Sequence, residues 1–120
     1  MPRSVVNPVV HVELQTCNLP RACAFYTRLF GWHAETIHVG SKTYLALDLG
    51  NGIQGGVVEG DVEHSLWLPY VEVADVAETT ARAQQLGASV LLEPREGPVG
   101  WRSIVAAHHG AKIAVWQPKL

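Results

Sequence analysis

The stretch Asn18–Gly31, NLPRACAFYTRLFG, predicts an amphipathic helix with clear signals at both ends. Asn18 is a good N-cap, Pro20 lies in the first turn where a missing N–H does no harm, and Gly31 suits the left-handed residue that ends a helix. Apolar side chains recur three and four positions apart, at Leu19, Ala22, Cys23, Tyr26, Leu29 and Phe30. This spacing predicts that one face of the helix is buried.

The stretch Asp75–Gly87, DVAETTARAQQLG, repeats the pattern, with its N-cap 57 positions after the first. Asp75 is the second N-cap, Glu78 has the capping-box spacing from it, and Gly87 ends the helix. The predicted buried stripe consists of Val76, Thr80, Ala83 and Leu86. Two helices with matching ends indicate a duplicated structural unit.

Short strand-like segments surround each helix in the same order, one before it and three after it. They are Val9–Gln15, Trp32–Val39, Thr43–Asp48 and Ile53–Val58 around the first helix, and Leu66–Val73, Ser89–Glu93, Trp101–Ala107 and Lys112–Gln117 around the second. We therefore predict an α+β fold in one domain, residues 1–120, with tandem βαβββ modules at 8–58 and 66–118 and a linker at 59–65. The modules are expected to form a cup-shaped mixed sheet with the helices on its outer face.

Composition excludes several classes of function. The net charge is −2 and the lysines and arginines are scattered, so we expect no nucleic-acid binding. No apolar run approaches the roughly 18 residues of a membrane span, and the first ten residues lack the apolar core of a secretion signal. Cys17 and Cys23 are too few for a disulfide framework. We expect reduced thiols in a cytoplasmic protein.

Strand alternation assigns side chains to the two faces of each predicted sheet, because neighbouring residues of a strand point in opposite directions. On the face away from the helix the first module places His11, Glu13, Gln15, Gln54 and Gly56, and the second Leu68, Tyr70, Glu72, Ala114 and Trp116. An antiparallel sheet with helices on one side needs a reason for a polar and aromatic second side. A ligand cavity or a dimer interface would provide one.

Three segments resemble the vicinal oxygen chelate superfamily. They are Val10–Leu14, VHVEL, the helix end Phe25–Trp32, FYTRLFGW, and Ala83–Ala88, AQQLGA. The superfamily includes glyoxalase I, bleomycin-resistance proteins, fosfomycin-resistance enzymes and extradiol dioxygenases, and the similarity covers residues 8 to 118. It implies the fold but no single activity, because this scaffold hosts many functions.

The resemblance also implies where a metal would be bound. Metal-dependent members place one His, Glu or Gln ligand on the first and one on the fourth strand of each module, which corresponds here to His11 and Gln54. The corresponding positions of the second module are Leu68 and Ala114, which cannot ligate a metal. Three protein ligands are the usual minimum for a catalytic metal, so we expect no cofactor. A divalent metal on His11 and Gln54 is the alternative.

The candidate ligand-binding residues are polar or aromatic. They are His11, Gln54, Tyr70, Trp101 and Trp116. Rings of tyrosine and tryptophan offer a large contact area to a flat ligand, and core packing is the alternative role. For His11 the alternative is a hydrogen-bonded cavity or interface histidine.

Glu13, Glu72 and His11 are the candidate acid–base residues. A partly buried carboxylate could serve as a general base, and a solvated or arginine-paired carboxylate is the alternative.

Three functions are consistent with these residues. The first is a metal-free cup that binds a small aromatic or oxygenated molecule, as bleomycin-resistance-like proteins do. The second is a metal-independent lyase, isomerase or cyclase using Glu13, Glu72 or His11. The third is a metal-dependent enzyme of the lactoylglutathione-lyase type. We favour the first, because half of the ligand positions are lost. The resemblance further implies a homodimer.

Overall fold

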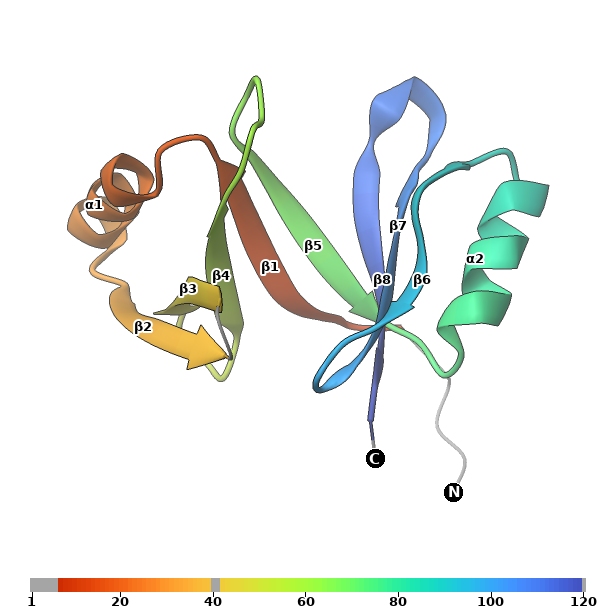
Figure 1. Cartoon of the computed structure of the whole chain (residues 1–120), viewed down its shortest axis with the longest axis horizontal. Helices are drawn as coiled ribbons and strands as arrows, with labels where there is room; N and C mark the ends of the chain where they lie inside the picture. The colour runs from red at the N-terminus through yellow and green to blue at the C-terminus, as the bar shows by residue number, and fades with distance from the viewer. Residues whose placement is uncertain (1–6, 40–41, 120) are drawn as a thin grey trace. The chain divides into compact units, whose positions relative to one another are not determined.

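The computed structural model describes residues 7–39 and 42–119, and Figure 1 shows its elements along the chain. They are β1 (Val9–Thr16), α1 (Leu19–Phe30), β2 (His33–Val39), β3 (Lys42–Asp48), β4 (Gln54–Glu59), β5 (Leu66–Glu72), α2 (Val76–Gln85), β6 (Ser89–Glu96), β7 (Gly100–Ala106), the 3₁₀ turn η1 (His108–Gly110) and β8 (Lys112–Pro118). The predicted α+β class and the tandem βαβββ order are confirmed.

The chain divides into two compact units. The first lies within His11–Leu68, and the second consists of residues 69–119 together with residues 7–10. The start of β1 belongs to the second unit because the carbonyl of Pro8 accepts the N–H of Glu72 at 2.9 Å. Glu59, the first residue of the predicted linker, is the last residue of β4. The organisation as a single domain stays a prediction.

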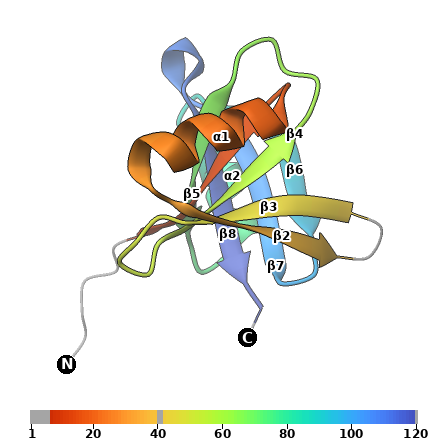
Figure 2. The ribbon, with the colours of Figure 1, turned by 90° about the vertical axis from the view of Figure 1, so that its left-hand side faces the viewer.

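In the first unit the strand order is β2-β3-β4-β1, with β1 parallel to β4 and the other pairs antiparallel. Leu14, Leu47 and Val57 are almost fully buried and form the core of this unit. Tyr26 on α1 contacts that core, and its hydroxyl accepts the indole N–H of Trp67 at 3.2 Å. Helix α1 therefore covers one face of the sheet, as Figure 2 shows.

The ends of α1 are those that the sequence predicts. The side chain of Asn18 accepts the N–H of Arg21 at 3.1 Å, and Gly31 has a φ of 71°. The predicted buried stripe is wrong at its end, since Leu29 and Phe30 are 57% and 56% exposed. Leu29 lies at the edge of the stripe. Phe30 is the last helical residue, and its ring lies against Tyr26 and Trp32 at the surface.

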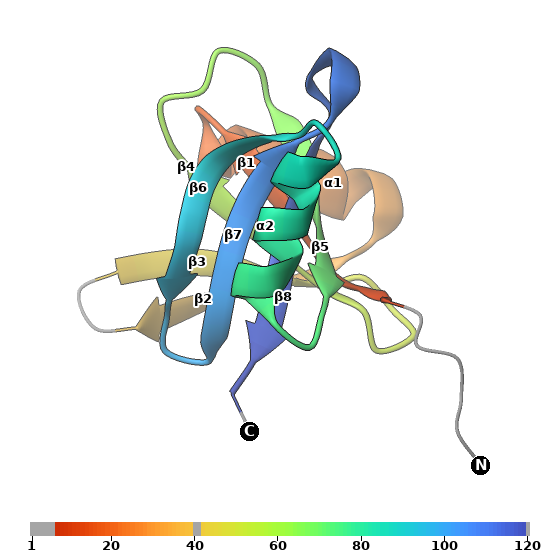
Figure 3. The same ribbon diagram turned by 90° about the vertical axis from the view of Figure 1, so that its right-hand side faces the viewer.

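In the second unit the strand order is β5-β8-β7-β6, with β5 parallel to β8. Helix α2 contacts β6, β7 and β8, and Figure 3 shows it in front of this sheet. Val73, Val76 and Val115 form the core, and the buried hydroxyls of Thr80 and Ser103 hydrogen-bond at 2.7 Å. Leu86, predicted in the stripe, is 68% exposed because α2 ends there.

A side chain at or near the end of the last strand of each module caps the helix of the same module. Glu59 accepts the N–H of Leu19 at 2.8 Å, and Gln117 accepts the N–H of Val76 at 2.9 Å. These N–H groups are among those that a helix leaves without an internal partner. The duplication therefore extends to a long-range cap that the sequence did not reveal.

Candidate functional site

The sheet of the first unit has a polar face on the side away from α1. His11 pairs with Gln54 across β1 and β4, and Glu13 pairs with Gly56. The His11 imidazole lies over Gly56, where an added Cβ would be 3.5 Å from Nε2. Strand β1 thus places His11 and Glu13 on this face while Leu14 points into the core.

His11 is half-buried on this face. Burial lowers the pKa of its imidazole below 6.5, and the nearby charge of Glu13 opposes that shift. Glu13 in turn accepts a hydrogen bond from the Gln15 amide at 3.2 Å. The lowered pKa favours a neutral imidazole near pH 7, with one nitrogen that donates a hydrogen bond and one that accepts.

The residues of this face do not form a complete metal site. His11 and Gln54 are two donors on neighbouring strands. Asp48 is next in the same row, but its carboxylate accepts the N–H of Gly50 at 3.0 Å in the turn after β3. Within residues 7–39 and 42–119 no group of three or more His, Cys, Asp or Glu side chains could hold a metal ion.

The strand register corrects one assignment in the second module. Glu13 pairs with Gly56, and Tyr70, which lies 57 positions after Glu13, pairs with Ala114. Ala114 is therefore the equivalent of Gly56, and Lys112, two residues earlier on β8, is the equivalent of Gln54. A protonated lysine has no lone pair for a metal. The second module therefore offers no metal donor at this position, whether Ala114 or Lys112 is compared.

The sheet of the second unit has an aromatic face away from α2. The rings of Tyr70 and Trp116 meet edge to face, with centroids 6.4 Å apart. Trp116 lies close over Gly100, since a Cβ at Gly100 would be only 2.6 Å from its indole ring. Glu72 pairs with Trp116 and lies on the same face. The second module therefore brings together the predicted Tyr70, Trp116 and Glu72.

Arg102 is a residue of this face that the sequence interpretation missed. It pairs with Trp116, and its guanidinium donates a hydrogen bond to the Tyr70 hydroxyl at 2.7 Å. The alternation of β7 could have found it, because Arg102 points away from Trp101 and Ser103.

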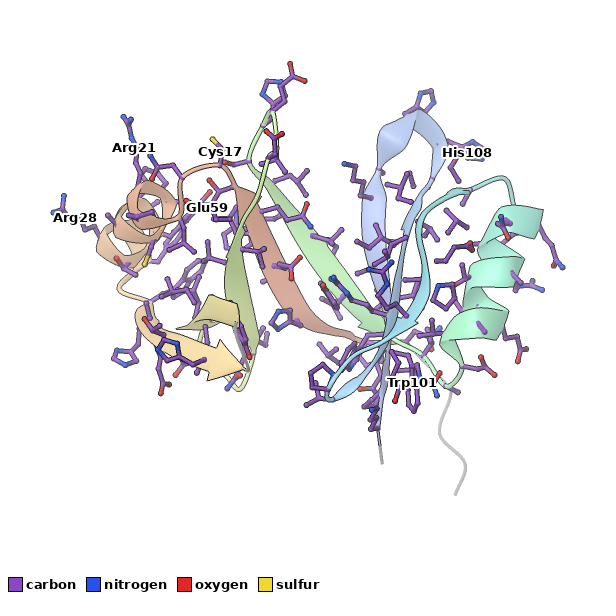
Figure 4. The ribbon with its side chains drawn as sticks, in the orientation of Figure 1. Cys17, Arg21, Arg28, Glu59, Trp101 and His108 are labelled. Carbon is purple, nitrogen blue, oxygen red and sulfur yellow. The ribbon has the colours of Figure 1, made fainter. Side chains whose placement is uncertain are left out.

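Trp101 does not belong to the aromatic face. It packs against Val73, Val76 and Val115 on the side of α2, and the ammonium of Lys119 lies 5.5 Å from its ring. Figure 4 labels its position in the second unit. The core-packing alternative therefore describes the position of Trp101.

The outer side of α1 carries a second feature that the sequence interpretation missed. A shallow depression there is lined by Arg21, Ala24, Phe25, Arg28 and Leu29. Figure 4 shows the two arginine side chains pointing away from the sheet of this unit. None of the predicted ligand-binding residues lies in it.

Comparison with known proteins identifies relatives of this chain at the level of family and fold. The family model described as Glyoxalase/Bleomycin resistance protein/Dioxygenase superfamily matches residues 9–115. A comparison with curated proteins finds no match. None of the helices in the described part of the chain is long and apolar enough to cross a membrane.

Solved structures share the fold over nearly the whole chain. Methylmalonyl-CoA epimerase from Mycobacterium tuberculosis matches with a TM-score of 0.67 and 15% identity, covering 98% of this chain and 94% of that one. A hypothetical protein from Bacillus halodurans C-125 gives a TM-score of 0.71 at 12% identity, covering 95% and 96%. Streptomyces coelicolor methylmalonyl-CoA epimerase in complex with 2-nitronate-propionyl-CoA gives 0.65 at 17% identity, covering 97% and 100%. At these identities the likeness shows the fold alone.

Proposed function

This chain belongs to the glyoxalase/bleomycin resistance protein/dioxygenase superfamily, and on that premise we propose that it binds a small aromatic or oxygenated organic molecule without a resident catalytic metal. The observation that carries the proposal is the identity of two side chains in the second module. Where the first module has His11 and Gln54, the second has Leu68 and Lys112. Two donors are fewer than the three that hold a catalytic metal.

The side chains that remain suit recognition of an organic ligand. Gln54 is exposed on its face and offers an amide donor and acceptor, and the half-buried His11 lies beside it on β1. In the second module the half-buried Trp116, whose ring meets the buried Tyr70 edge to face, provides aromatic surface for a flat molecule. A mostly apolar surface with a few placed polar groups is typical of small-molecule sites.

A thermal-shift screen of the full chain against aromatic metabolites and antibiotics tests this proposal. At a free ligand concentration of 100 Kd a true ligand stabilises the protein by about 2.7 kcal/mol, which raises the Tm by several degrees. Compounds that raise the Tm are then titrated into the variant Gln54→Ala and into Gln84→Ala, an exposed glutamine on α2. Affinity is expected to fall only in Gln54→Ala. A screen without any stabilising compound would contradict the proposal.

A second candidate function is a metal-independent lyase, isomerase or cyclase. The observation that favours it is the neutral half-buried His11 imidazole beside the Glu13 carboxylate, a pair able to accept and return a proton. Methylmalonyl-CoA epimerases are among the structures that share the fold. If this candidate holds, Glu13→Gln or Glu72→Gln lowers turnover about 10²- to 10⁴-fold and changes the pH–rate profile. Binding unchanged in both variants, with no turnover of any ligand, would count against it.

The metal-dependent lactoylglutathione-lyase type is the least supported function, because its ligand set would be incomplete. Elemental analysis of the purified protein is expected to find no stoichiometric metal. Added Ni²⁺, Zn²⁺ or Mn²⁺ is expected to cause no activation.

A homodimer is part of the proposal. Phe25 and Leu29 on the outer side of α1 are each 57% exposed and line the same depression, and adjoining exposed apolar side chains are a feature of protein–protein contacts. Sedimentation equilibrium is expected to give twice the mass of 13.1 kDa. A monomer at micromolar concentration would contradict this part.

A further inference from the structure

Four side chains form one row across the sheet of the second unit, on the face away from α2. Glu72 pairs with Trp116, Trp116 with Arg102, and Arg102 with Arg95. Paired residues of neighbouring strands share a face, so one carboxylate, one indole and two guanidinium groups follow each other in that order. The adjacent arginines are the unusual part of this row.

Two like charges directly opposite each other on neighbouring strands destabilise a sheet. In the part of the chain that the structure describes, neither Arg95 nor Arg102 has a carboxylate within ion-pair distance, whereas Lys119 forms an ion pair with Glu96. Glu72 is the only acidic member of the row and lies on the other side of Trp116. Two adjacent arginines without a carboxylate partner in the protein indicate a binding site for an anionic ligand.

The row is also held in position. Arg102 donates to the Tyr70 hydroxyl at 2.7 Å, and Tyr70 is only 6% exposed. Trp116 is fixed against β7, because Gly100 leaves the room for its indole ring. One bond to Tyr70 leaves most of the five N–H donors of Arg102 for a ligand. Arg95 is exposed and free to turn toward the same anion.

We propose that this face binds a planar aromatic carboxylate, with the ring against Trp116 and the carboxylate on Arg102 and Arg95. The planar fork of a guanidinium matches the two oxygens of a carboxylate, and a ring next to it matches the flat indole. The inference rests on the proposed function and narrows its ligand class from small organic molecules to aromatic acids.

The experiment is a calorimetric titration with three acids, each compared with its own amide. Benzoate, 2-naphthoate and indole-3-carboxylate are titrated into the full chain, and so are the three neutral amides of the same shape. At least one acid is expected to bind about tenfold more tightly than its amide, which is the effect of one charge-assisted contact. Raising the salt concentration should reduce this difference.

Two variants locate the carboxylate. Arg95→Gln removes an exposed guanidinium without disturbing Tyr70, and Arg82→Gln on α2 removes the same charge elsewhere. Arg95→Gln is expected to abolish most of the difference between acid and amide, while Arg82→Gln retains it. Trp116→Phe should weaken acid and amide alike, since it reduces the stacking surface that both use.

Three outcomes would overturn the inference. They are equal affinity for every acid and its amide, no binding of any of the six compounds, and an equal loss in Arg95→Gln and Arg82→Gln. The first and third would leave the proposed function intact, because a small molecule would still bind. The compound screen described above decides the proposed function independently.

Discussion

The two modules share their backbone design and differ in the chemistry of one sheet face. Each has an Asx residue at the helix N-cap, a side chain from the last strand on the first helical N–H, and a parallel pairing of its first and last strands. On the face away from the helix, the first module places His11, Glu13 and Gln54, and the second Tyr70, Trp116 and Arg102. The caps and registers are needed for each module to fold, whereas exposed or half-buried positions of that face, such as Gln54 and Trp116, can differ between the modules.

The largest expected difference between the modules is the cost in stability of replacing the glycine beneath Trp116, Gly100, or the glycine beneath His11, Gly56. A Cβ at Gly100 would be 2.5 Å from the carbonyl oxygen of Gln117 and 2.6 Å from Trp116, whereas at Gly56 it would be 3.5 Å from His11. Gly100→Ala should therefore cost roughly 2–3 kcal/mol of unfolding free energy as overpacking does, and Gly56→Ala less than about 1 kcal/mol. Urea denaturation of the two variants measures both. Equal costs would show that Trp116 is not seated on Gly100.

Removing the long-range helix caps should produce a smaller difference in stability between the two modules. Gln117→Ala leaves the N–H of the buried Val76 without its acceptor and should cost about 1–2 kcal/mol. Glu59→Ala exposes a more accessible N–H, that of Leu19, to water and should cost about 0.5–1 kcal/mol. Thermal unfolding of both variants is the measurement. A larger loss in Glu59→Ala would contradict the assigned burial.

The smallest effect is the pH dependence that His11 gives the first module. Because burial lowers its folded pKa below 6.5, the unfolded chain binds the proton more readily. The contribution of His11 to the free energy of unfolding is therefore complete above pH 6.5 and is lost as the pH falls toward the folded pKa. The charge of Glu13 stabilises the protonated imidazole and so makes this loss smaller.

His11→Gln is expected to flatten this part of the stability profile relative to the wild type. Chemical denaturation between pH 7.5 and 5 measures the difference between the two proteins, in which the other titrating groups cancel. Parallel profiles over the whole interval would contradict the lowered pKa.

Much of the fold could be predicted from the sequence, because its signals are local. Asn18, Gly31 and Asp75 mark helix ends by their own conformational preferences, and the alternation along β1 separates His11 from Leu14. The predicted buried stripes extend too far at Leu29 and Leu86, because helical spacing does not say where the sheet beneath a helix ends.

The candidate site could be predicted only in part, because it depends on register. Glu13 and Tyr70 can be matched from the sequence, because they are 57 positions apart, as are the two helix N-caps. Which residue of β8 corresponds to Gln54 depends instead on how β5 and β8 are aligned. That alignment identifies Lys112 rather than Ala114. The pairing of Arg95 with Arg102 depends likewise on irregularities in β6 that no local pattern reveals.

We propose that this chain binds its ligand without a metal, and a titration of chelator-treated protein can show whether it does. The compound that raises the Tm most in the screen is titrated before and after one equivalent of Mn²⁺ is added. We expect the same affinity in both titrations and the same affinity as in untreated protein. Binding that disappears on chelation and returns with Mn²⁺ would contradict it.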